Sequence, residues 1–289
     1  MRFAVVHECR EDFSVAMMCR LLEVSESGYY AWAARPESNR ARSDRALAVE
    51  VRAEFARSKG RYGSPRMQRA LRSSHPNLGR RRTAKIMRRE GLVVRPRRGR
   101  PKTTDSKHTR RIAPNLLKRN FTTTAANEAW VGDITYIATF SGRMYLAVLL
   151  DLFSRKVVGW ALANHMRDEL VLEALEMAVR RRRPSPGVTH HTDRGSQYAS
   201  DNYLAALSAG GFAPSMSRKA DCWDNAVAES FFASLKTELG DTFESASDAR
   251  ARIRGYIEDF YNCQRLHSSI GYVSPVHYEL LNQTAARAA

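Results

Sequence analysis

The sequence has little cysteine and no long apolar run. Its four cysteines form no close pair: Cys9, Cys19, Cys222 and Cys263. This spacing argues against a disulfide framework or a cysteine zinc site, and it is typical of a reducing cytoplasm. The longest apolar stretches, such as residues 145–150, fall far short of the roughly 18 residues that span a bilayer. The N-terminus reaches His7 and acidic residues too early for a signal peptide. We therefore expect a cytoplasmic protein without membrane association.

Acidic residues are scarce in the first part of the chain. The 289 residues include 47 Lys+Arg and 30 Asp+Glu, for a formal net charge of +17. Residues 1–120 hold 30 basic and 11 acidic side chains, whereas residues 121–289 hold 17 and 19. Residues 61–120 alone carry 20 basic and only 2 acidic groups. This excess favours a polyanion partner, and the predominance of Arg suits phosphate. A membrane surface is disfavoured because the segment lacks a wide apolar helix face.

Helical periodicity dominates residues 1–93, which we interpret as an all-α, helix-turn-helix DNA-binding region. Residues 14–32 predict two short helices that meet near residues 23–25, with Ser25 capping the second. This pair is either a helix-turn-helix or an ordinary helical hairpin. Further helices are predicted over residues 44–58, 66–71 and 80–90. Ser64 and Pro65 open the second of these, and Gly91 ends the third.

Residues 94–120 are interpreted as a basic linker to the rest of the chain. Its first part, residues 94–112, is rich in Arg, Pro and Thr and has no periodicity, so we expect it to be disordered until it lies along DNA. Phosphate contacts are expected from basic residues of the helical region and the linker: Arg66, Arg80, Arg81, Arg82, Arg88, Arg89, Arg97 and Arg98.

Composition changes near Phe121, where an α/β segment begins. Strands are predicted over residues 129–137, 143–150, 155–163, 188–192 and 212–216. Helices are predicted over residues 168–183, 201–209 and 224–239. Three meander strands followed by α/β crossovers predict a mixed five-stranded sheet with flanking helices. We place a core at residues 121–240 and a helical tail at residues 241–289, with a further helix over residues 248–270.

Three acidic residues occupy positions that favour a shared site. Asp133 lies inside an apolar strand, where a charge is costly unless it is paired or bound to a metal. Asp193 follows the fourth strand, at the edge where α/β sheets form sites. Glu229 follows Asp193 with 35 residues intervening, on the same helix face as Asn225 and Lys236. If the first and fourth strands are adjacent, this helix can bring Glu229 over both aspartates. The core stripe of the helix is predicted to be Ala228, Phe231 and Leu235.

Three clustered carboxylates repel one another, and a pair of divalent metal ions removes that difficulty. Two hard cations about 3.5–4 Å apart activate the attacking oxygen and stabilise the leaving oxygen of a phosphoryl displacement. For any single carboxylate, a cap or surface role is the simpler interpretation. Asp151 is interpreted as a turn residue, with a minor metal role as the alternative. Asp221 and Asp224 are interpreted as loop and cap acids. His190 and His191 lack the partners of a zinc site.

Five separate blocks of the sequence resemble, in order, the second open reading frame (OrfB) of transposases of the insertion-sequence-3 family, which has a DDE integrase-like catalytic core. The blocks are WVGDITYI, YLAVLLDLFSRKVVGWAL, HHTDRGSQYAS, SMSRKADCWDNAVAESFFASLKTE and YNCQRLHSSIGYVSP. The family pattern is two aspartates and a glutamate, with 35 residues between the second and third and a basic residue seven positions later. Asp133, Asp193, Glu229 and Lys236 match it. YGSPRMQRAL and GRRRTAKIMRREGL resemble the family's helix-turn-helix segment.

The resemblance implies a ribonuclease-H-like fold and a DNA transposase, a polynucleotidyl transferase that uses two Mg²⁺ ions, with Mn²⁺ as a substitute. Asp133 would bridge both ions, Asp193 and Glu229 would each complete one site, and Lys236 would contact the end DNA. Water would expose a 3′-hydroxyl at the element end, and that hydroxyl would attack a second phosphodiester without a covalent enzyme intermediate.

The resemblance also implies partners and a location. The partners are the terminal inverted repeats, the target DNA, further copies of this chain in a synaptic complex, and an upstream OrfA product or a fusion with it. The implied location is the bacterial cytoplasm, at the nucleoid. Two other functions stay open. A ribonuclease-H-like nuclease shares the three acids, although the basic helical half and Lys236 favour strand transfer. A non-catalytic DNA-binding modulator of transposition has no reason to keep three clustered acids.

Overall fold

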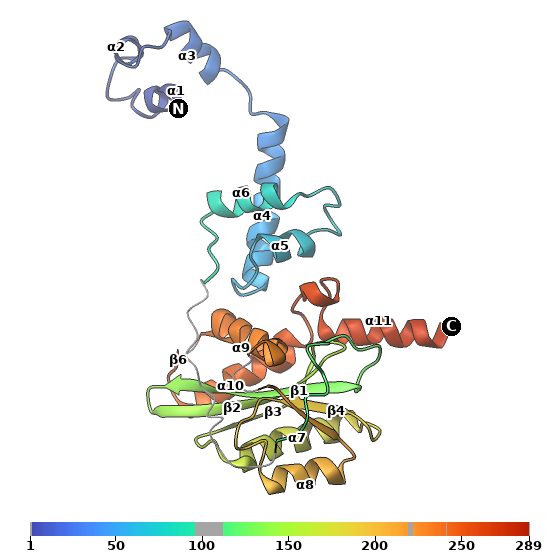
Figure 1. Ribbon diagram of the computed structural model, residues 1–289. Coiled ribbons are helices and arrows are strands. Elements are labelled where there is room, and N and C mark those ends of the chain that lie inside the picture. The colour runs from blue at the N-terminus through green and yellow to red at the C-terminus, as the bar shows by residue number, and fades with distance from the viewer. Residues whose placement is uncertain (1, 96–111, 219–221, 241, 289) are drawn as a thin grey trace.

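The computed structural model describes residues 2–95, 112–218, 222–240 and 242–288. A mixed sheet with helices on both faces forms the C-terminal half, and a helical region of α4, α5 and α6 lies above one face (Figure 1). The first three helices form a separate small cluster at the far end of α4 (Figure 1). Within the described ranges, no helix is long and apolar enough to cross a membrane.

The N-terminal cluster contains α1 (Arg2–Glu8), α2 (Val15–Leu21) and α3 (Glu26–Ala33). Its small core consists of Val6, Met18, Cys19 and Tyr29. The Ser25 hydroxyl accepts a hydrogen bond from the Gly28 N–H at 3.1 Å, so the predicted cap and the predicted break between the two helices are confirmed. Helix α1 was not predicted, because Val6 is the one residue that it buries.

The helical region contains α4 (Asn39–Arg57), α5 (Ser64–Ala70) and α6 (Arg80–Arg89). All three helices were predicted, but α4 begins earlier than expected, with Ser38 as its N-cap. Gly63 rather than Ser64 caps α5, so that prediction was wrong by one residue. Gly91 follows α6 with a φ of +66°, a left-handed conformation that favours glycine, and this confirms the predicted helix end.

The sheet has the strand order β3-β2-β1-β4-β5. Its strands are β1 (Ala129–Thr139), β2 (Gly142–Asp151), β3 (Val157–Ala163), β4 (Thr189–Thr192) and β5 (Ala213–Met216). β1, β2 and β3 form an antiparallel meander, and β4 pairs parallel with both β1 and β5. The predicted mixed sheet is confirmed. A sixth strand, β6 (Thr242–Phe243), pairs parallel with the end of β1 and was too short to predict.

One face of the sheet is covered by α7 (Asp168–Arg182) and α8 (Asp201–Ala209), which lie below the sheet in Figure 1. Helix α7 rests directly on β3 at Gly159. A Cβ atom at that position would lie 2.1 Å from the Ala174 carbonyl oxygen, so only glycine permits this close approach.

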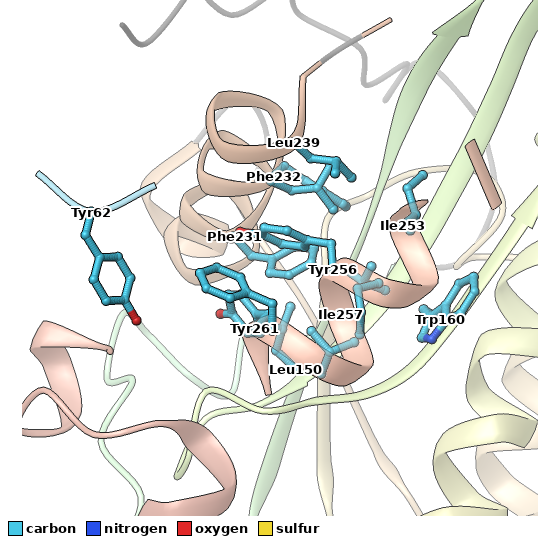
Figure 2. Packing of buried hydrophobic residues seen from close by; sticks show 14 of the residues in the cluster. Tyr62, Leu150, Trp160, Phe231, Phe232, Leu239, Ile253, Tyr256, Ile257 and Tyr261 are labelled. Carbon is cyan, nitrogen blue, oxygen red and sulfur yellow. The ribbon is translucent and has the colours of Figure 1, made fainter. Parts of the chain in front are cut away.

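The other face is covered by α9 (Ala226–Leu239) and α10 (Ala246–Arg254), which continues as π-helical turns (Gly255–Tyr261). The predicted stripe of Ala228, Phe231 and Leu235 is buried, as expected. Figure 2 shows aromatic rings filling the space between α9 and the π-helical turns, where the Phe231 and Tyr261 ring centroids lie 4.8 Å apart. The helix predicted over residues 248–270 starts at Ala246 and ends at Tyr261, so its predicted end was wrong. A short 3-10 turn (Ser268–Ile270) and α11 (Pro275–Ala288) follow.

A buried ion pair joins the end of α9 to the segment after the π-helical turns. Arg265 donates from Nη2 to Glu238 Oε1 at 2.7 Å and from Nε to Oε2 at 2.9 Å. Their side chains are only 4% and 5% exposed. Tyr256 donates its hydroxyl hydrogen to Oε2 of the same carboxylate at 2.9 Å. Glu238 is therefore satisfied from several directions, as a buried charge requires.

The helical region docks beside this ion pair. Arg66 of α5 donates from Nε to the Leu266 carbonyl oxygen at 2.9 Å. The Tyr62 hydroxyl donates to the Gln264 carbonyl oxygen at 3.2 Å and accepts from the Leu266 N–H at 3.1 Å. Figure 2 shows Tyr62 approaching from the helical region. The helical region and the sheet half therefore share one continuous core.

Arg265→Met should lower the free energy of unfolding by about 3–5 kcal/mol, because it leaves the Glu238 carboxylate buried without its main partner. Urea denaturation of the full chain measures this. The double variant R265M/E238L should recover part of the loss. Arg45→Met breaks the exposed pair with Glu37, in which Arg45 is 72% exposed, and should cost under about 1 kcal/mol. Equal losses for Arg265→Met and Arg45→Met would contradict the structural role of the buried pair.

Candidate active site

The pairing of β1 with β4 brings Asp133 and Asp193 together. Val131 pairs with His191 in the parallel register of these strands. The same register extended by two residues sets Asp193, the first residue after β4, beside Asp133. Asp193 Oδ1 accepts the Gly195 N–H at 2.9 Å, which shapes the turn after the strand. The condition on which the predicted site depended, adjacency of the first and fourth strands, is met.

Helix α9 runs along β1 and carries Glu229 to the level of Asp133. At its start, Asn225 Nδ2 donates to the Gly132 carbonyl oxygen at 3.3 Å. Near its end, Lys236 Nζ lies 4.6 Å from the centroid of the Tyr136 ring. Eleven residues of helix span about 16 Å and four residues of strand about 14 Å, so the two contacts are consistent with a helix aligned along the strand. Glu229 follows Asn225 by about one helical turn.

The electrostatics of Asp133 show that the four predicted residues share one environment. The Asp133 side chain is half-buried. Burial raises the pKa of Asp133 well above its ordinary value, and the negative charges of Asp193 and Glu229 raise it further. The positive charge of Lys236 acts in the opposite direction. The site therefore concentrates more negative charge than its own cation offsets.

The donor set fits a hard divalent cation. As placed in the structure, no three His, Cys, Asp or Glu side chains among the described residues are grouped closely enough to hold an ion. The acids thus lie within electrostatic range of one another without ligand geometry. Carboxylate oxygens are the ligands that Mg²⁺ prefers, and a cation would relieve the repulsion that raises the pKa of Asp133. Asp133, Asp193 and Glu229 are the candidate ligands.

Tyr198 is a residue near the site that the sequence analysis missed. Its side chain is buried, and burial, followed by the negative charge of Asp133, raises the pKa of its hydroxyl well above the ordinary value. It lies in the block HHTDRGSQYAS, five residues after Asp193, and that spacing was the available signal. A neutral hydroxyl at this position can donate a hydrogen bond toward the acidic group.

Asp151 is the last residue of strand β2 and is buried, so the interpretation of it as a turn residue was wrong by one position. It lies at the end of β2, where its carboxylate accepts the Phe153 N–H at 2.9 Å and the Asn127 N–H at 2.9 Å. Arg182 of α7 pairs with it at 3.1 Å. Burial raises the pKa of Asp151 despite these partners. The carboxylate thus ties a helix and a loop to the strand end.

Asp224 was interpreted as a cap, and this was wrong. It lies within a short 3-10 turn (Cys222–Asn225), and the residue that immediately precedes α9 is Asn225. Asp224 is buried and accepts hydrogen bonds from Arg218, and these hold its pKa far below the ordinary range. Its carbonyl oxygen bonds His191 Nε2 at 3.0 Å. The contacts of Asp224 with Arg218 and His191 therefore anchor the start of α9, the helix that carries Glu229. Asp221 lies outside the described residues.

The two histidines of β4 are buried in hydrogen bonds with the protein. His190 Nε2 lies 2.6 Å from the Tyr203 hydroxyl, and His191 Nδ1 lies 2.8 Å from the Ser215 hydroxyl. Burial lowers the pKa of His190 to about 3 and also lowers that of His191. Both rings are neutral at physiological pH and serve the packing around β4.

Helix α6 presents basic side chains to solvent. Its buried side consists of Thr83, Ile86 and Met87, which pack into the core. Four of the predicted DNA-contact residues are exposed on it: Arg80, Arg81, Arg88 and Arg89. This arrangement leaves a basic surface available above the packed side of the helix.

Three of the predicted DNA-contact residues make contacts within the protein, and one of them, Arg89, is at the same time exposed. Arg82 Nε pairs with Asp44 Oδ1 at 2.6 Å, and Arg89 Nη2 bonds the Asp44 carbonyl oxygen at 3.3 Å. Arg66 lies in the docking contact with Leu266. These contacts give the three arginines a role in packing the helical region. Arg97 and Arg98 lie outside the described residues.

Comparison with known protein families matches separate parts of the chain. Two integrase core domain families match residues 123–222 and 210–275, and an HTH-like domain family matches residues 42–100. The mixed sheet with flanking helices, preceded by the HTH-like region, defines a ribonuclease-H-like integrase core of the DDE-type polynucleotidyl transferases. The helix-turn-helix resemblance of the basic segment is thereby confirmed.

Relatives that match nearly the whole chain come from insertion sequences, and several of them are named transposases. The Transposase InsF for insertion sequence IS3A of Escherichia coli (strain K12) is 40% identical over 98% of this chain and 99% of its own length. An uncharacterized 31 kDa protein of insertion element IS600 from Shigella sonnei is 41% identical over 93% of this chain and 100% of its own length. The chain belongs to the IS3 family of transposases.

Solved structures include more distant likenesses. The simian T-cell lymphotropic virus intasome matches with a TM-score of 0.47 and 15% sequence identity, over 73% of this chain and 70% of that chain. The family assignment rests on the sequence relatives.

Without divalent metal, Asp133→Asn should make the protein more stable at pH 7, by on the order of 1 kcal/mol or more. The raised folded-state pKa means that protonated Asp133 stabilises the fold below the ordinary pKa of 3.8. This contribution is lost as pH rises through the folded-state pKa, and the neutral Asn avoids that loss. Urea unfolding between pH 4 and 8 measures the difference, which should shrink toward pH 4.

Asp12→Asn, a change at an exposed N-terminal position, serves as the matched control and should leave the pH dependence of stability as in the wild type. An Asp133→Asn variant with unchanged or lower stability at pH 7 would show that the Asp133 carboxylate is not under repulsion.

Proposed function

We propose that Asp133, Asp193 and Glu229 are the catalytic residues of this transposase and bind divalent metal, with Mg²⁺ as the natural ion, Mn²⁺ as a substitute, and two ions per site. The observation that carries the proposal is the convergence of three acids from β1, the end of β4 and α9 around one half-buried side chain. A structural role alone does not account for it, because the repulsion opposes folding. Phosphoryl transfer by two-metal sites requires such a group of acids.

The residues of the chain have distinct roles in the proposed reaction. Bound metal would supply activation of the attacking oxygen and stabilisation of the leaving oxygen. Asp133, Asp193 and Glu229 would hold that metal through their carboxylate oxygens. Lys236, held near the Tyr136 ring, contacts a phosphate of the end DNA. Water breaks a phosphodiester bond at the element end and releases a 3′-hydroxyl, which then attacks a target phosphodiester and displaces its 3′ oxygen.

DNA is the substrate, and the basic helical region holds it. Exposed Arg80, Arg81 and Arg88 of α6 are proposed to contact the backbone of the terminal inverted repeats, because phosphate contacts position a protein on DNA. The proposed organisation is a helical DNA-binding region at residues 1–93, a basic linker at 94–120, the catalytic core at 121–240, and a helical tail at 241–289. Arg97 and Arg98 of the linker are further proposed contacts.

The reaction also sets the partners and the location. Two element ends must be held together, so further copies of the chain are proposed in the synaptic complex. An upstream OrfA product, or a fusion with it, is the proposed partner for recognising the element ends. Because DNA is the substrate, the proposed location of the protein is the bacterial nucleoid in the cytoplasm.

Asp133→Asn or Glu229→Gln should abolish the cleavage of inverted-repeat DNA in Mg²⁺ or Mn²⁺, with a loss of at least about 10³-fold, because either change removes a charged ligand of the metal. Gel analysis of end-labelled duplex measures the cleavage. Asp201→Asn and Glu173→Gln on exposed faces of α8 and α7 are the matched controls and should stay within about twofold of the wild type. Normal cleavage by Asp133→Asn would refute the assignment.

A duplex that already carries a free 3′-hydroxyl end separates strand transfer from simple hydrolysis. The wild-type protein should join this end to a target plasmid, because the second step needs only the hydroxyl and the same three acids. Product that is cut but never joined would indicate a nuclease. DNA binding with neither product, and without any dependence on metal, would indicate a non-catalytic modulator.

A further inference from the structure

A pocket of about 320 Å³ lies at the seam between the helical region and the end of α9. We call it the seam pocket. It is formed by the turn after α4, the segment after α6, the last turn of α9 and α10. Its lining residues are Phe55, Lys59, Gly60, Arg61, Val93, Val94, Arg95, Thr237, Glu238, Leu239 and Arg252. None of these residues belongs to the candidate active site or to the predicted DNA contacts.

The seam pocket is strongly cationic. Its basic lining residues are Lys59, Arg61, Arg95 and Arg252, and its one acidic lining residue is Glu238. The Glu238 carboxylate is already neutralised by Arg265, which lies outside the pocket. Arg252 is also paired with Asp248 at 3.6 Å, so Lys59, Arg61 and Arg95 supply most of the excess positive charge, which favours an anion.

The negative end of the α9 helix dipole does not cancel this charge. Arg61 Nε donates to the Glu238 carbonyl oxygen at 3.3 Å, and Arg252 Nη2 donates to the Leu239 carbonyl oxygen at 3.0 Å. Two guanidinium groups thus satisfy the last carbonyl groups of the helix. Both groups have further N–H donors beyond the ones used in these bonds.

The cations are set in place by the fold. The Arg61 guanidinium carbon lies 4.2 Å from the Phe260 ring centroid, and its side chain is buried. Lys59 and Gly60 have φ values of +53° and +69°, so a left-handed turn presents this edge of the pocket. Arg95 Nη1 lies 3.2 Å from the position that a Cβ of Gly240 would take, so Arg95 reaches the end of α9.

The position of the seam pocket relative to the triad suits one DNA strand. Thr237 lines the pocket and directly follows Lys236. Eight residues of α9 separate Glu229 from Thr237, about 12 Å along the helix. The phosphates of one DNA strand advance about 3.4 Å per nucleotide along the duplex axis. A strand that follows α9 from the triad would therefore reach the pocket after about three to four nucleotides.

We propose that the seam pocket binds a backbone phosphate of the element-end DNA about three to four nucleotides from the phosphate that is cut. The proposal rests on the proposed function, since it takes the element end as the substrate of the triad. The pocket holds the helical region and the catalytic helix against the same strand. It therefore fixes the distance between the helical region, which holds the DNA, and the phosphodiester bond that is cut.

The test compares full-length wild-type protein with K59Q/R95Q, which removes two exposed cations of the pocket and leaves buried Arg61 unchanged. R180Q/R183Q on the opposite side of the sheet removes two exposed charges as the matched control. Binding to a 40-base-pair duplex carrying the inverted repeat that flanks this gene is measured in EDTA across a range of salt. K59Q/R95Q should lower the slope of log affinity against log salt by about one, the value for one lost phosphate contact. The control should leave the slope unchanged.

A scan with single neutral methylphosphonates locates the contact. Neutralising the phosphate three or four nucleotides from the cut should weaken binding by the wild type and have no further effect on K59Q/R95Q. An unchanged slope for K59Q/R95Q, an equal drop for the control, or equal sensitivity of both proteins at every position would overturn the proposal.

A third arm adds inorganic phosphate alone. Phosphate that stabilises the wild type but not K59Q/R95Q against heat, while both bind DNA equally, would assign the pocket to a free phosphate and overturn the DNA contact. Because binding is measured in EDTA, an inactive triad would leave these results unaffected, so the two proposals fail separately.

Discussion

The placement of half-buried Asp133 near two other carboxylates is the constraint on which the rest of the structure depends. Burial raises the pKa of Asp133 most, and the negative charges of Asp193 and Glu229 raise it further. The parallel register of β1 and β4 and the docking of α9 along β1 are what hold the acids near one another. A cation bound at these acids would reduce the repulsion among them. This accounts for the use of divalent metal by an IS3 family transposase.

Helix α9 connects this site to the rest of the molecule. Its start is tied to β1 through Asn225 and anchored through Asp224, and its end is held through Glu238 by Arg265. The helical region docks next to this end through Tyr62. The helical region that is proposed to hold DNA and the acids that are proposed to cut it thus contact opposite ends of one helix. A shift of the helical region would displace α9 and with it Glu229.

Much of the fold and of the candidate site was predictable, because both follow from local patterns. Alternation and helical periodicity located the five main strands and α9, and the charge inside a strand marked Asp133. The adjacency of β1 and β4 had to be assumed for the predicted site, because strand pairing depends on the tertiary fold and not on local sequence. Net charge likewise could not tell which arginines serve packing. Half-buried Arg82 binds Asp44, whereas Arg80 and Arg81 are exposed, and only the position of Asp44 in the fold separates them.

The central claim is that Asp133, Asp193 and Glu229 bind the same metal site. Fe²⁺ bound in place of Mg²⁺ generates hydroxyl radicals that cut the polypeptide near the ion, and the fragments can be mapped by mass spectrometry. The account predicts cuts near all three acids in the wild-type chain. All three should be suppressed by Mg²⁺ and absent in Asp133→Asn. Cuts near only one of the acids, or a pattern unchanged in Asp133→Asn, would contradict it.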